Sequence, residues 1–162
     1  ARNFPDYNFV LAAAPSLEDD LFAPFLKDYP NLSIVRNQTY KLLELAKAAM
    51  VTSGTATLET ALFEVPEVVC YKGSFISIQI AKLIIDIKYI SLVNLVMNRE
   101  VVRELIQKDF NEKLLRTELG KLLEDEKYRR AMIHNFSLLI EKLGGGGASD
   151  RTAQLIVDDL KS

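Results

Sequence analysis

Residues 49–64 read AMVTSGTATLETALFE, and this stretch sets the fold that the rest of the sequence must fit. The apolar run over residues 49–52 predicts a buried strand, and a helical pattern follows from Thr55 to Glu64. Between them lies Gly54, which lets the backbone come close to a ligand at this strand-to-helix corner. Doubly wound α/β proteins bind their ligands at such corners, at the carboxyl ends of the strands.

Short apolar runs alternate with helical patterns on both sides of this corner. Further strands are predicted at residues 7–13, 32–35, 65–71 and 89–92, and further helices at 16–27, 39–48 and 75–87. Ser16 is the expected N-cap of the first helix, and Pro24 its expected kink or early stop. Continuous rather than alternating apolar strands indicate a parallel sheet covered on both faces. The expected fold class is therefore α/β, a Rossmann-like doubly wound parallel sheet.

The last third of the sequence is predicted to be helical. Asn111 is expected to cap a leucine-rich helix, and a second helical pattern follows until Gly144–Gly147 breaks it. Ser149 is the expected N-cap of a final helix. We divide the chain into a Rossmann-like domain at residues 1–110 and C-terminal helices at residues 111–162 that pack on the same domain.

The composition excludes several classes of function. The chain has 162 residues, of which 49% are hydrophobic and 26% charged, as in an ordinary globular domain. A formal net charge of −2 disfavours nucleic-acid binding. Cys70 is the single cysteine, which rules out an internal disulfide and fits a reducing compartment. No Cys/His cluster predicts a metal site, and no apolar run reaches the ~18 residues that a membrane span needs.

Two strand-to-helix corners carry candidate binding residues. Ser53, Gly54 and Thr55 lie at a helix start, where free N–H groups favour a phosphate or diphosphate. Glu59 follows about one turn later, where its carboxylate would accept hydrogen bonds from ribose hydroxyls. Tyr71 and Lys72 lie at the second corner, where the lysine would neutralise a phosphate. The alternative is that Ser53 or Thr55 merely caps a helix, Glu59 is solvated, and Lys72 lies in an ordinary turn.

A third polar segment follows the predicted strand at residues 89–92. Asn94 lies within an apolar stretch, so a buried amide there needs hydrogen-bond partners from the backbone or from a ligand. We expect a helix beyond Arg99, with Glu100, Glu104 and Gln107 on one face. A merely solvated helix face is the alternative.

The predicted helix at residues 75–87 has an unusually broad apolar surface. Gln79, Lys82 and Asp86 form one narrow polar stripe, and isoleucines cover most of the remaining circumference. Burial on two sides or against a partner subunit explains this pattern. Contact of an exposed flank with acyl chains or a membrane surface is the alternative.

Three longer stretches carry a resemblance to a known family. They read SGTATLETALFEVPEVVCYKGS (53–74), YISLVNLVMNREVVRELIQ (89–107) and LGGGGASDRTA (143–153). In their order and spacing, over about residues 37–160, they resemble successive motifs of the lipid A disaccharide synthases. That family consists of two-domain glycosyltransferases of the GT-B type. The resemblance implies that residues 1–110 form the nucleotide-sugar-binding domain, the C-terminal half of a GT-B fold.

The resemblance also implies a reaction. The donor would be UDP-2,3-diacylglucosamine and the acceptor 2,3-diacylglucosamine 1-phosphate, and an inverting transfer would give lipid A disaccharide 1-phosphate and UDP. No metal or cofactor is expected. The family resemblance places the enzyme in the cytoplasm, as a peripheral protein at the inner face of the bacterial inner membrane, and leaves a homodimer open.

The resemblance implies that Ser53, Gly54, Thr55 and Glu59 hold the phosphates and ribose of the nucleotide, and that Asn94, Glu100 and Gln107 serve donor binding or turnover. With Tyr71, Lys72 and Arg99, these are the candidate substrate- or UDP-binding residues. Val93 and Asn98 depart from the proline and glycine of many members, so the loop after Asn94 is expected to differ in shape. The acceptor domain of the family, with the expected general base, has no counterpart in these residues. This chain alone is therefore expected to be incomplete for catalysis.

Two other functions remain open from the sequence. A UDP-N-acetylglucosamine 2-epimerase shares the architecture and a Ser-Gly-rich loop, but the segment after Val65-Pro66 lacks the expected Arg-Pro-Glu element. A non-catalytic nucleotide-sugar-binding module is the second alternative.

Overall fold

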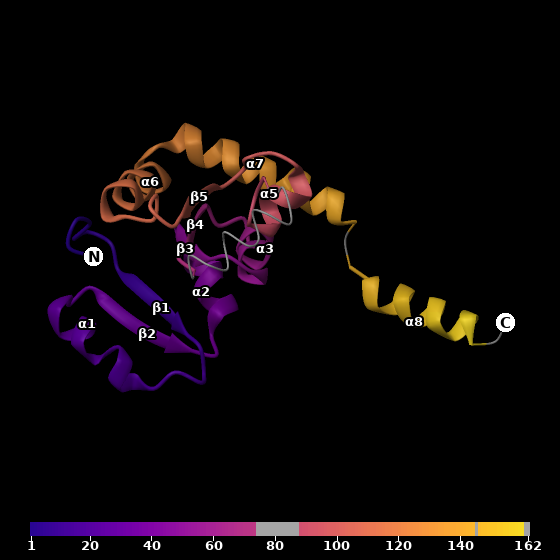
Figure 1. The fold of residues 1–162 in the computed structure, drawn as a ribbon, viewed down its shortest axis with the longest axis horizontal. Helices are drawn as coiled ribbons and strands as arrows, with labels where there is room; N and C mark the ends of the chain where they lie inside the picture. The colour runs from indigo at the N-terminus through magenta and orange to yellow at the C-terminus, as the bar shows by residue number, and fades with distance from the viewer. Residues whose placement is uncertain (74–87, 145, 161–162) are drawn as a thin grey trace.

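The computed structural model describes residues 1–73, 88–144 and 146–160. Its strands are β1 (Phe9–Ala13), β2 (Leu32–Arg36), β3 (Ala49–Thr52), β4 (Glu67–Tyr71) and β5 (Arg103–Ile106). Every strand pair within these residues is parallel, which confirms the α/β class with a parallel sheet. The strands form two ladders, β1–β2 and β3–β4–β5, rather than one continuous sheet (Figure 1).

The crossover between β1 and β2 differs from the predicted helix over residues 16–27. It consists of a 3₁₀ turn, η1 (Asp19–Leu21), and a short helix, α1 (Ala23–Asp28). Ser16 caps neither element, because Glu18 precedes the 3₁₀ turn and Phe22 precedes α1. Pro24 lies in the first turn of α1 and does not stop it, since the N–H that proline lacks has no helical partner there.

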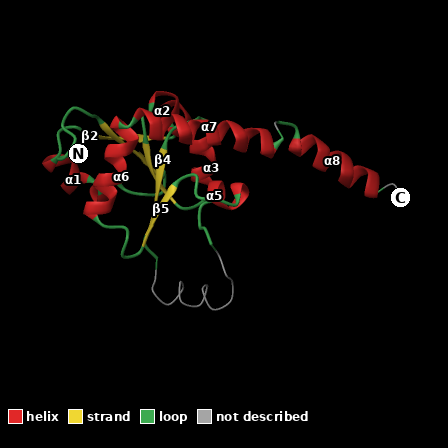
Figure 2. Ribbon diagram, turned by 90° about the horizontal axis from the view of Figure 1, so that it is seen from above, coloured by secondary structure: helices red, strands yellow, loops and turns green. Residues whose placement is uncertain are grey.

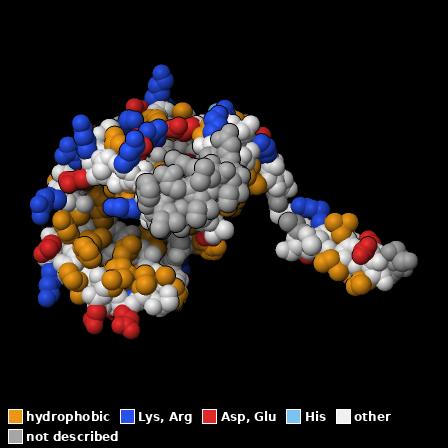
Figure 3. All heavy atoms as spheres, in the orientation of Figure 1, with side chains coloured by type: hydrophobic (Ala, Val, Ile, Leu, Met, Phe, Trp, Pro, Cys, Tyr) orange, Lys and Arg blue, Asp and Glu red, His pale blue; other side chains and the backbone are white. Residues whose placement is uncertain are grey.

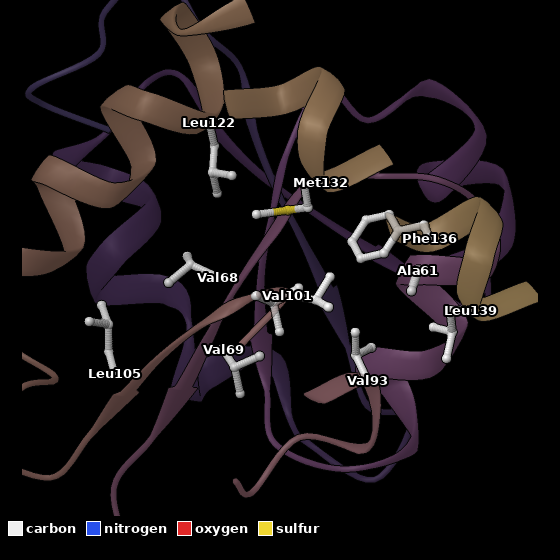
Figure 4. Close-up of a cluster of buried hydrophobic side chains, with 11 residues drawn as sticks. Ala61, Val68, Val69, Val93, Val101, Leu105, Leu122, Met132, Phe136 and Leu139 are labelled. Carbon is white, nitrogen blue, oxygen red and sulfur yellow. The ribbon is translucent and has the colours of Figure 1, made fainter. Parts of the chain in front are cut away.

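The β3–β4–β5 ladder carries the hydrophobic core. Val68 and Val69 are neighbours in β4, so their side chains point to opposite faces, and both are fully buried. Helix α3 (Thr55–Leu62) packs on β3 and β4, and α6 (Glu112–Glu124) packs on β4 and β5. Figure 4 shows Met132, Phe136 and Leu139 of α7 (Glu126–Leu143) pointing into the same cluster. This ladder is therefore covered on both faces.

The segment before β5 corrects two predictions. Residues 89–92 do not form a strand; instead, Ser91 caps the helix α5 (Leu92–Met97), accepting a hydrogen bond from the Asn94 N–H. Asn98 ends this helix in the left-handed conformation, at φ 52°. The expected helix through Glu100, Glu104 and Gln107 is also wrong, since residues 103–106 form β5 and pair with β4. The β-branched pair Val101-Val102 before β5 is fully or almost fully buried, a pattern that suits extended chain.

Helices α6 and α7 begin at polar caps. Asn111 accepts from the Leu114 N–H, which confirms its predicted capping role, and Asp125 accepts from the Tyr128 N–H to start α7. Gly144 ends α7 with φ 79°. The last helix, α8 (Ala148–Asp159), begins after Gly147, so Ser149 lies inside the helix and is not its cap.

Helix α8 projects from the rest of the molecule (Figures 1 and 2). All residues from Ser149 to Leu160 are exposed, and Leu155 is 70% exposed. Among the described residues, no helix is both long enough and apolar enough to cross a membrane. The predicted helix at residues 75–87, with its candidate lipid-facing flank, lies outside the described residues.

Candidate functional site

The corner between β3 and α3 has a backbone that only glycine adopts readily. Gly54 precedes α3 with φ 153° and ψ −163°, a region that is almost exclusive to glycine. A Cβ atom on Gly54 would have no heavy atom within 4 Å outside its immediate neighbours. The space above the corner is therefore open, and glycine is required there by the backbone and not by crowding.

The amino end of α3 retains free hydrogen-bond donors. No side chain caps the helix, and the N–H groups of Thr55 and Ala56 have no acceptor among the described residues. Both residues are exposed. The Thr57 hydroxyl is not free, because it is buried and donates to the Gly54 carbonyl at 2.8 Å. Unpaired N–H groups and the positive end of the helix dipole together favour an anion at this position.

A cleft of about 440 Å³ lies beside the first turns of α3. It is lined by Glu59 and by residues 37–41, which comprise the two residues after β2 and the first turn of α2 (Thr39–Leu45). Glu59 is half-buried, and its carboxylate has no hydrogen bond or ion pair among the described residues. Tyr40, at the wall of the cleft, is 58% exposed and stacks on Phe63 with ring centroids 5.5 Å apart. The cleft thus offers free carboxylate oxygens and an exposed aromatic ring.

The second corner lies at the neighbouring strand end. Thr52 pairs with Cys70, so Tyr71, the last residue of β4, and Lys72, the first residue after it, lie next to the Gly54 corner. Lys72 is exposed and has no ion pair among the described residues. Burial raises the pKa of the Cys70 thiol to about 11, so this cysteine stays a thiol at neutral pH.

Gln107 holds the carboxyl ends of β4 and β5 together. Its N–H donates to the Tyr71 carbonyl at 2.9 Å, and its side-chain amide donates to the Gly73 carbonyl at 2.9 Å. Gln107 itself has φ 52°, the left-handed conformation. The structure therefore brings Gln107 to the second corner, where it fixes the backbone on both sides of Lys72.

Asn94 is fully buried, and the protein itself satisfies its carboxamide. The oxygen accepts from the N–H groups of Val101 and Val102 at 2.7 and 3.0 Å. The nitrogen donates to the Val102 carbonyl at 2.8 Å and to the Glu104 carboxylate at 2.9 Å. Asn94 therefore ties α5 to the chain that enters β5.

The Glu104 carboxylate connects this buried network to the first corner. It accepts from the N–H groups of Ile90 and Ser91, each at 2.9 Å, and from the Ser91 hydroxyl at 2.7 Å. The Ile90 carbonyl in turn accepts from the Ser53 hydroxyl at 3.0 Å. A continuous path of hydrogen bonds thus runs from Ser53 through the peptide group between Ile90 and Ser91 to Glu104 and Asn94.

Arg99 and Glu100 lie apart from both corners. They precede the amino end of β5, and the corners lie at the carboxyl ends of strands parallel to it. Arg99 donates to the Asn135 side chain at 2.6 Å, and Glu100 pairs with Arg103 at 3.3 Å; all of these contacts are solvent-exposed. The structure thus brings Ser53, Gly54, Thr55, Glu59 and the β4 corner together, and leaves Arg99 and Glu100 at the opposite edge of the sheet.

The sequence profile of the lipid-A-disaccharide synthetase family matches residues 2–156, nearly the whole chain. The chain belongs to this family. A lipid-A-disaccharide synthase of Trichlorobacter lovleyi is 37% identical over 155 residues, which are 94% of this chain and 40% of that protein. The synthase of Geobacter sulfurreducens is 35% identical over 160 residues, 98% of this chain and 42% of that protein. A Coxiella burnetii synthase is 34% identical over 152 residues.

The chain thus spans about two fifths of the length of these curated synthases. Membership of the synthase family confirms the resemblance that the motifs indicated. Within the described residues, no cluster of three or more His, Cys, Asp and Glu side chains suits a metal ion.

Sequence reasoning missed part of the site in this synthase-family chain. No motif in the sequence marks residues 37–41 as ligand-binding, although they follow β2 at the carboxyl edge. The rule that parallel α/β sheets bind ligands at that edge would have included them. The role of Glu104 as the centre of a buried network had no signal in the sequence, because the segment was predicted as a helix.

Proposed function

We propose that this chain is the UDP-sugar-binding half of a lipid-A-disaccharide synthase. The observation that carries the proposal is the open Gly54 corner with its free helix N–H groups, next to a cleft that holds the unpartnered Glu59 carboxylate. The complete enzyme would condense UDP-2,3-diacylglucosamine with 2,3-diacylglucosamine 1-phosphate. Because both substrates carry acyl chains, we place the enzyme at the inner face of the inner membrane as a peripheral protein.

The diphosphate would bind at the amino end of α3. The free N–H groups of Thr55 and Ala56 would donate to an anion placed over Gly54, and the Thr55 hydroxyl would add a further donor. Lys72 follows the adjacent strand and would neutralise part of the phosphate charge, while the Tyr71 ring packs over Gly73 beside it. Ser53 would hold the corner in place, since its hydroxyl already donates to the Ile90 carbonyl.

The nucleoside would occupy the cleft beside Glu59. The Glu59 carboxylate can accept hydrogen bonds from both ribose hydroxyls, and nothing in the described protein competes for it. The exposed face of Tyr40 offers a surface on which a uracil ring would stack. The amides of Asn37 and Gln38 at the cleft wall suit the alternating donors and acceptors of the uracil edge.

This arrangement suits the chemistry of glycosyl transfer. The acceptor hydroxyl oxygen attacks the anomeric carbon of the donor, the bond from that carbon to the UDP phosphate oxygen breaks, and the acceptor proton passes to a general base. Negative charge grows on the diphosphate as the bond breaks, so donors placed there lower the barrier. The general base would come from outside these residues, and no described side chain of the site is assigned to it.

The remaining predicted residues would act on the site from a distance. Asn94 and Gln107 would position the two corners through the backbone contacts described above. We assign Arg99 and Glu100 to the turn between α5 and β5, where they would not touch the nucleotide.

Titration with UDP and with inorganic pyrophosphate, followed by backbone amide shifts, tests the proposal. Both ligands should shift the amides of Ser53, Gly54 and Thr55, whereas only UDP should shift those of residues 37–41. Replacing Glu59 by Gln should weaken UDP binding about tenfold, the equivalent of roughly 1.4 kcal/mol for a charged hydrogen bond, and leave pyrophosphate binding unchanged.

Glu44→Gln is the matched control, because Glu44 is an exposed carboxylate in α2 outside the cleft lining. It should leave the affinity for both ligands unchanged. UDP shifts confined to α6 and α7, or equal losses from Glu59→Gln and Glu44→Gln, would contradict the proposed site.

A further inference from the structure

The peptide group between Ile90 and Ser91 bridges a half-buried carboxylate and the β3–α3 corner. The Ser91 N–H of this group donates to Glu104 Oε1 at 2.9 Å. The Ile90 carbonyl of the same group accepts from the Ser53 hydroxyl at 3.0 Å. Because a peptide group is planar and its N–H and C=O point in opposite directions, fixing one end also fixes the other. The direction of the Ser53 hydroxyl is therefore linked to the position of the Glu104 carboxylate.

Four hydrogen bonds hold the Glu104 carboxylate in place. Oε2 accepts from the Ile90 N–H at 2.9 Å, and Oε1 accepts from the N–H and the hydroxyl of Ser91 at 2.9 and 2.7 Å. Oε1 also accepts from the Asn94 amide at 2.9 Å, and Asn94 is itself fully buried and bonded to the chain that enters β5. Hydrogen bonds to a carboxylate are shorter and stronger than those between neutral groups. Glu104 is therefore a firm anchor for residues 90 and 91.

The charge of Glu104 is not neutralised by a cation in the described part of the chain. All four donors are neutral groups, and none of the ion pairs among these residues includes Glu104. Figure 3 shows many of the lysine and arginine side chains projecting from the surface around α6 and α7. β5 lies two strand spacings from β3, roughly 10 Å, and a negative charge at such a distance disfavours a bound anion. Any favourable effect of Glu104 on diphosphate binding must therefore come from the groups that it positions.

The β3–α3 corner needs support from outside α3. Gly54 has φ 153°, and no side chain caps the helix that follows it. Glycine has the greatest backbone freedom of all residues, so ordering it on ligand binding is costly. Among the described residues, the contact from Ser53 to Ile90 is the only side-chain hydrogen bond that joins residues 53–55 to a segment outside β3 and α3. Loss of this contact would leave the corner less ordered.

We propose that Glu104 is a positioning residue for the diphosphate site. It acts through the peptide group between Ile90 and Ser91 on the Ser53 hydroxyl, which holds the backbone immediately before Gly54. Glu104 does not touch the nucleotide in this role. It orders the corner before the anion binds, so less conformational entropy is lost on binding. This inference rests on the proposed function, because it requires the diphosphate to bind at the β3–α3 corner.

Titration of the full-length natural polypeptide with inorganic pyrophosphate and with UDP tests the proposal. Glu104→Gln keeps the shape of the side chain but places an NH₂ group against the N–H of Ile90 or of Ser91. We expect the affinity for both ligands to fall about tenfold, because both use the corner. Removal of a negative charge would by itself raise both affinities. Unchanged or raised affinity would therefore overturn the proposal.

Glu118→Gln is the matched control for a general loss of stability. Glu118 is a buried carboxylate in α6 that accepts from Tyr128 and Lys121, and within the described residues it has no hydrogen bond to residues 53–55 or 90–104. Glu118→Gln should lower the urea midpoint and leave the affinity for pyrophosphate unchanged. If Glu118→Gln and Glu104→Gln reduce the affinity equally, Glu104 has no specific role at the site and the proposal is wrong.

A double-mutant cycle with Ser53→Ala tests the route through the peptide group. Ser53→Ala alone should weaken pyrophosphate binding about fivefold, whereas Ser53→Thr, which keeps the hydroxyl, should stay within about twofold of the natural protein. The double variant should bind about as weakly as Glu104→Gln alone. Independent losses, which would multiply to about fiftyfold, would overturn the route. If Glu104→Gln does not fold, Ser91→Ala takes its place in the cycle, with the same expected outcome, because it removes the 2.7 Å contact to Glu104.

The amide shifts of the natural protein separate this proposal from the proposed function. If neither pyrophosphate nor UDP shifts the amides of residues 53–55, both the proposed function and the role of Glu104 are wrong. If both ligands shift these amides and Glu104→Gln leaves their affinity unchanged, only the role of Glu104 is wrong.

Discussion

Val69 in β4 is fully buried, whereas Leu11 in β1 is 39% exposed, although both are apolar residues in the middle of parallel strands. The difference lies in what covers the strands. β4 has strands on both edges and helices α3 and α6 in contact with it. Among the described residues, β1 pairs on one edge only, and an open apolar cleft lies on one of its faces. The strand sequences predict a buried sheet for both ladders, β1–β2 and β3–β4–β5. The strand side chains are buried only where other elements cover the strands.

Two phenylalanines provide the largest test of this contrast. Phe136 is fully buried in the core cluster, and Phe25 in α1 is 57% exposed. In this chain Phe136→Ala should lower the free energy of unfolding by about 3–5 kcal/mol, because it removes a large buried side chain and leaves a cavity. Phe25→Ala should cost less than about 1 kcal/mol. Urea denaturation measures the free energy of unfolding of both variants. Equal losses would refute the contrast between the two ladders.

Asn94→Ala tests whether the stability of the part around the β3–β4–β5 ladder depends on the buried hydrogen-bond network of Asn94. The change removes the partners of the Val101 and Val102 backbone groups and of one Glu104 oxygen, so we expect a loss of about 2–4 kcal/mol in unfolding free energy. Asn135→Ala, at a contact that is solvent-exposed, should cost below about 1 kcal/mol. A loss from Asn94→Ala no greater than that of Asn135→Ala would show that the network is dispensable.

Glu67 in β4 is expected to destabilise the β3–β4–β5 ladder when its carboxyl group is ionised. It is fully buried, both carboxyl oxygens lack a partner among the described residues, and desolvation raises its pKa well above the usual value. Because the folded-state pKa exceeds the unfolded value, its contribution to stability is complete below about pH 4.3 and is lost as the pH rises through the folded-state pKa.

The expected decrease in unfolding free energy has a slope of up to about 1.4 kcal/mol per pH unit over that window. Glu67→Gln should remove this component, since the amide does not titrate. Chemical denaturation of both proteins from pH 4 to pH 8 measures the difference, and parallel pH profiles would contradict the assignment.

Two glycines give the smallest expected effects. Gly54 has φ 153° at the corner between β3 and α3, so Gly54→Ala should cost about 1–3 kcal/mol of unfolding free energy through backbone strain. Gly120 lies within α6 with open space around it, so Gly120→Ala should stabilise the protein by roughly 0.5–1 kcal/mol. Thermal unfolding compares the two, and stabilisation by both substitutions would show that the corner is not strained.

The elements around the β3–α3 corner could be predicted because their signals are local. Residues 49–52 form β3 with the predicted bounds, and α3 begins at the predicted Thr55. Asn111 was identified as a cap because capping involves residues only three positions apart. The predicted N-caps at Ser16 and Ser149 are wrong. The N-cap positions are occupied by Glu18 and Gly147 instead.

Non-local contacts decided what the sequence could not. The segment from Arg103 to Ile106 has a charge pattern that suits a helix, yet it is a strand because β4 offers an edge with matching hydrogen bonds. The sequence marks Asn94 and Gln107 as candidate UDP-binding residues, but in the structure their side chains bond to backbone groups that only the folded chain brings near.

The sequence by itself determined the alternation of strands and helices, the glycine corner and the family, because these depend on residue types and short spacings. The tertiary structure decided which polar side chains face solvent and which form hydrogen bonds within the protein. It also showed that β1 and β3 each pair on one edge only among the described residues, since strand pairing depends on segments that lie far apart along the chain.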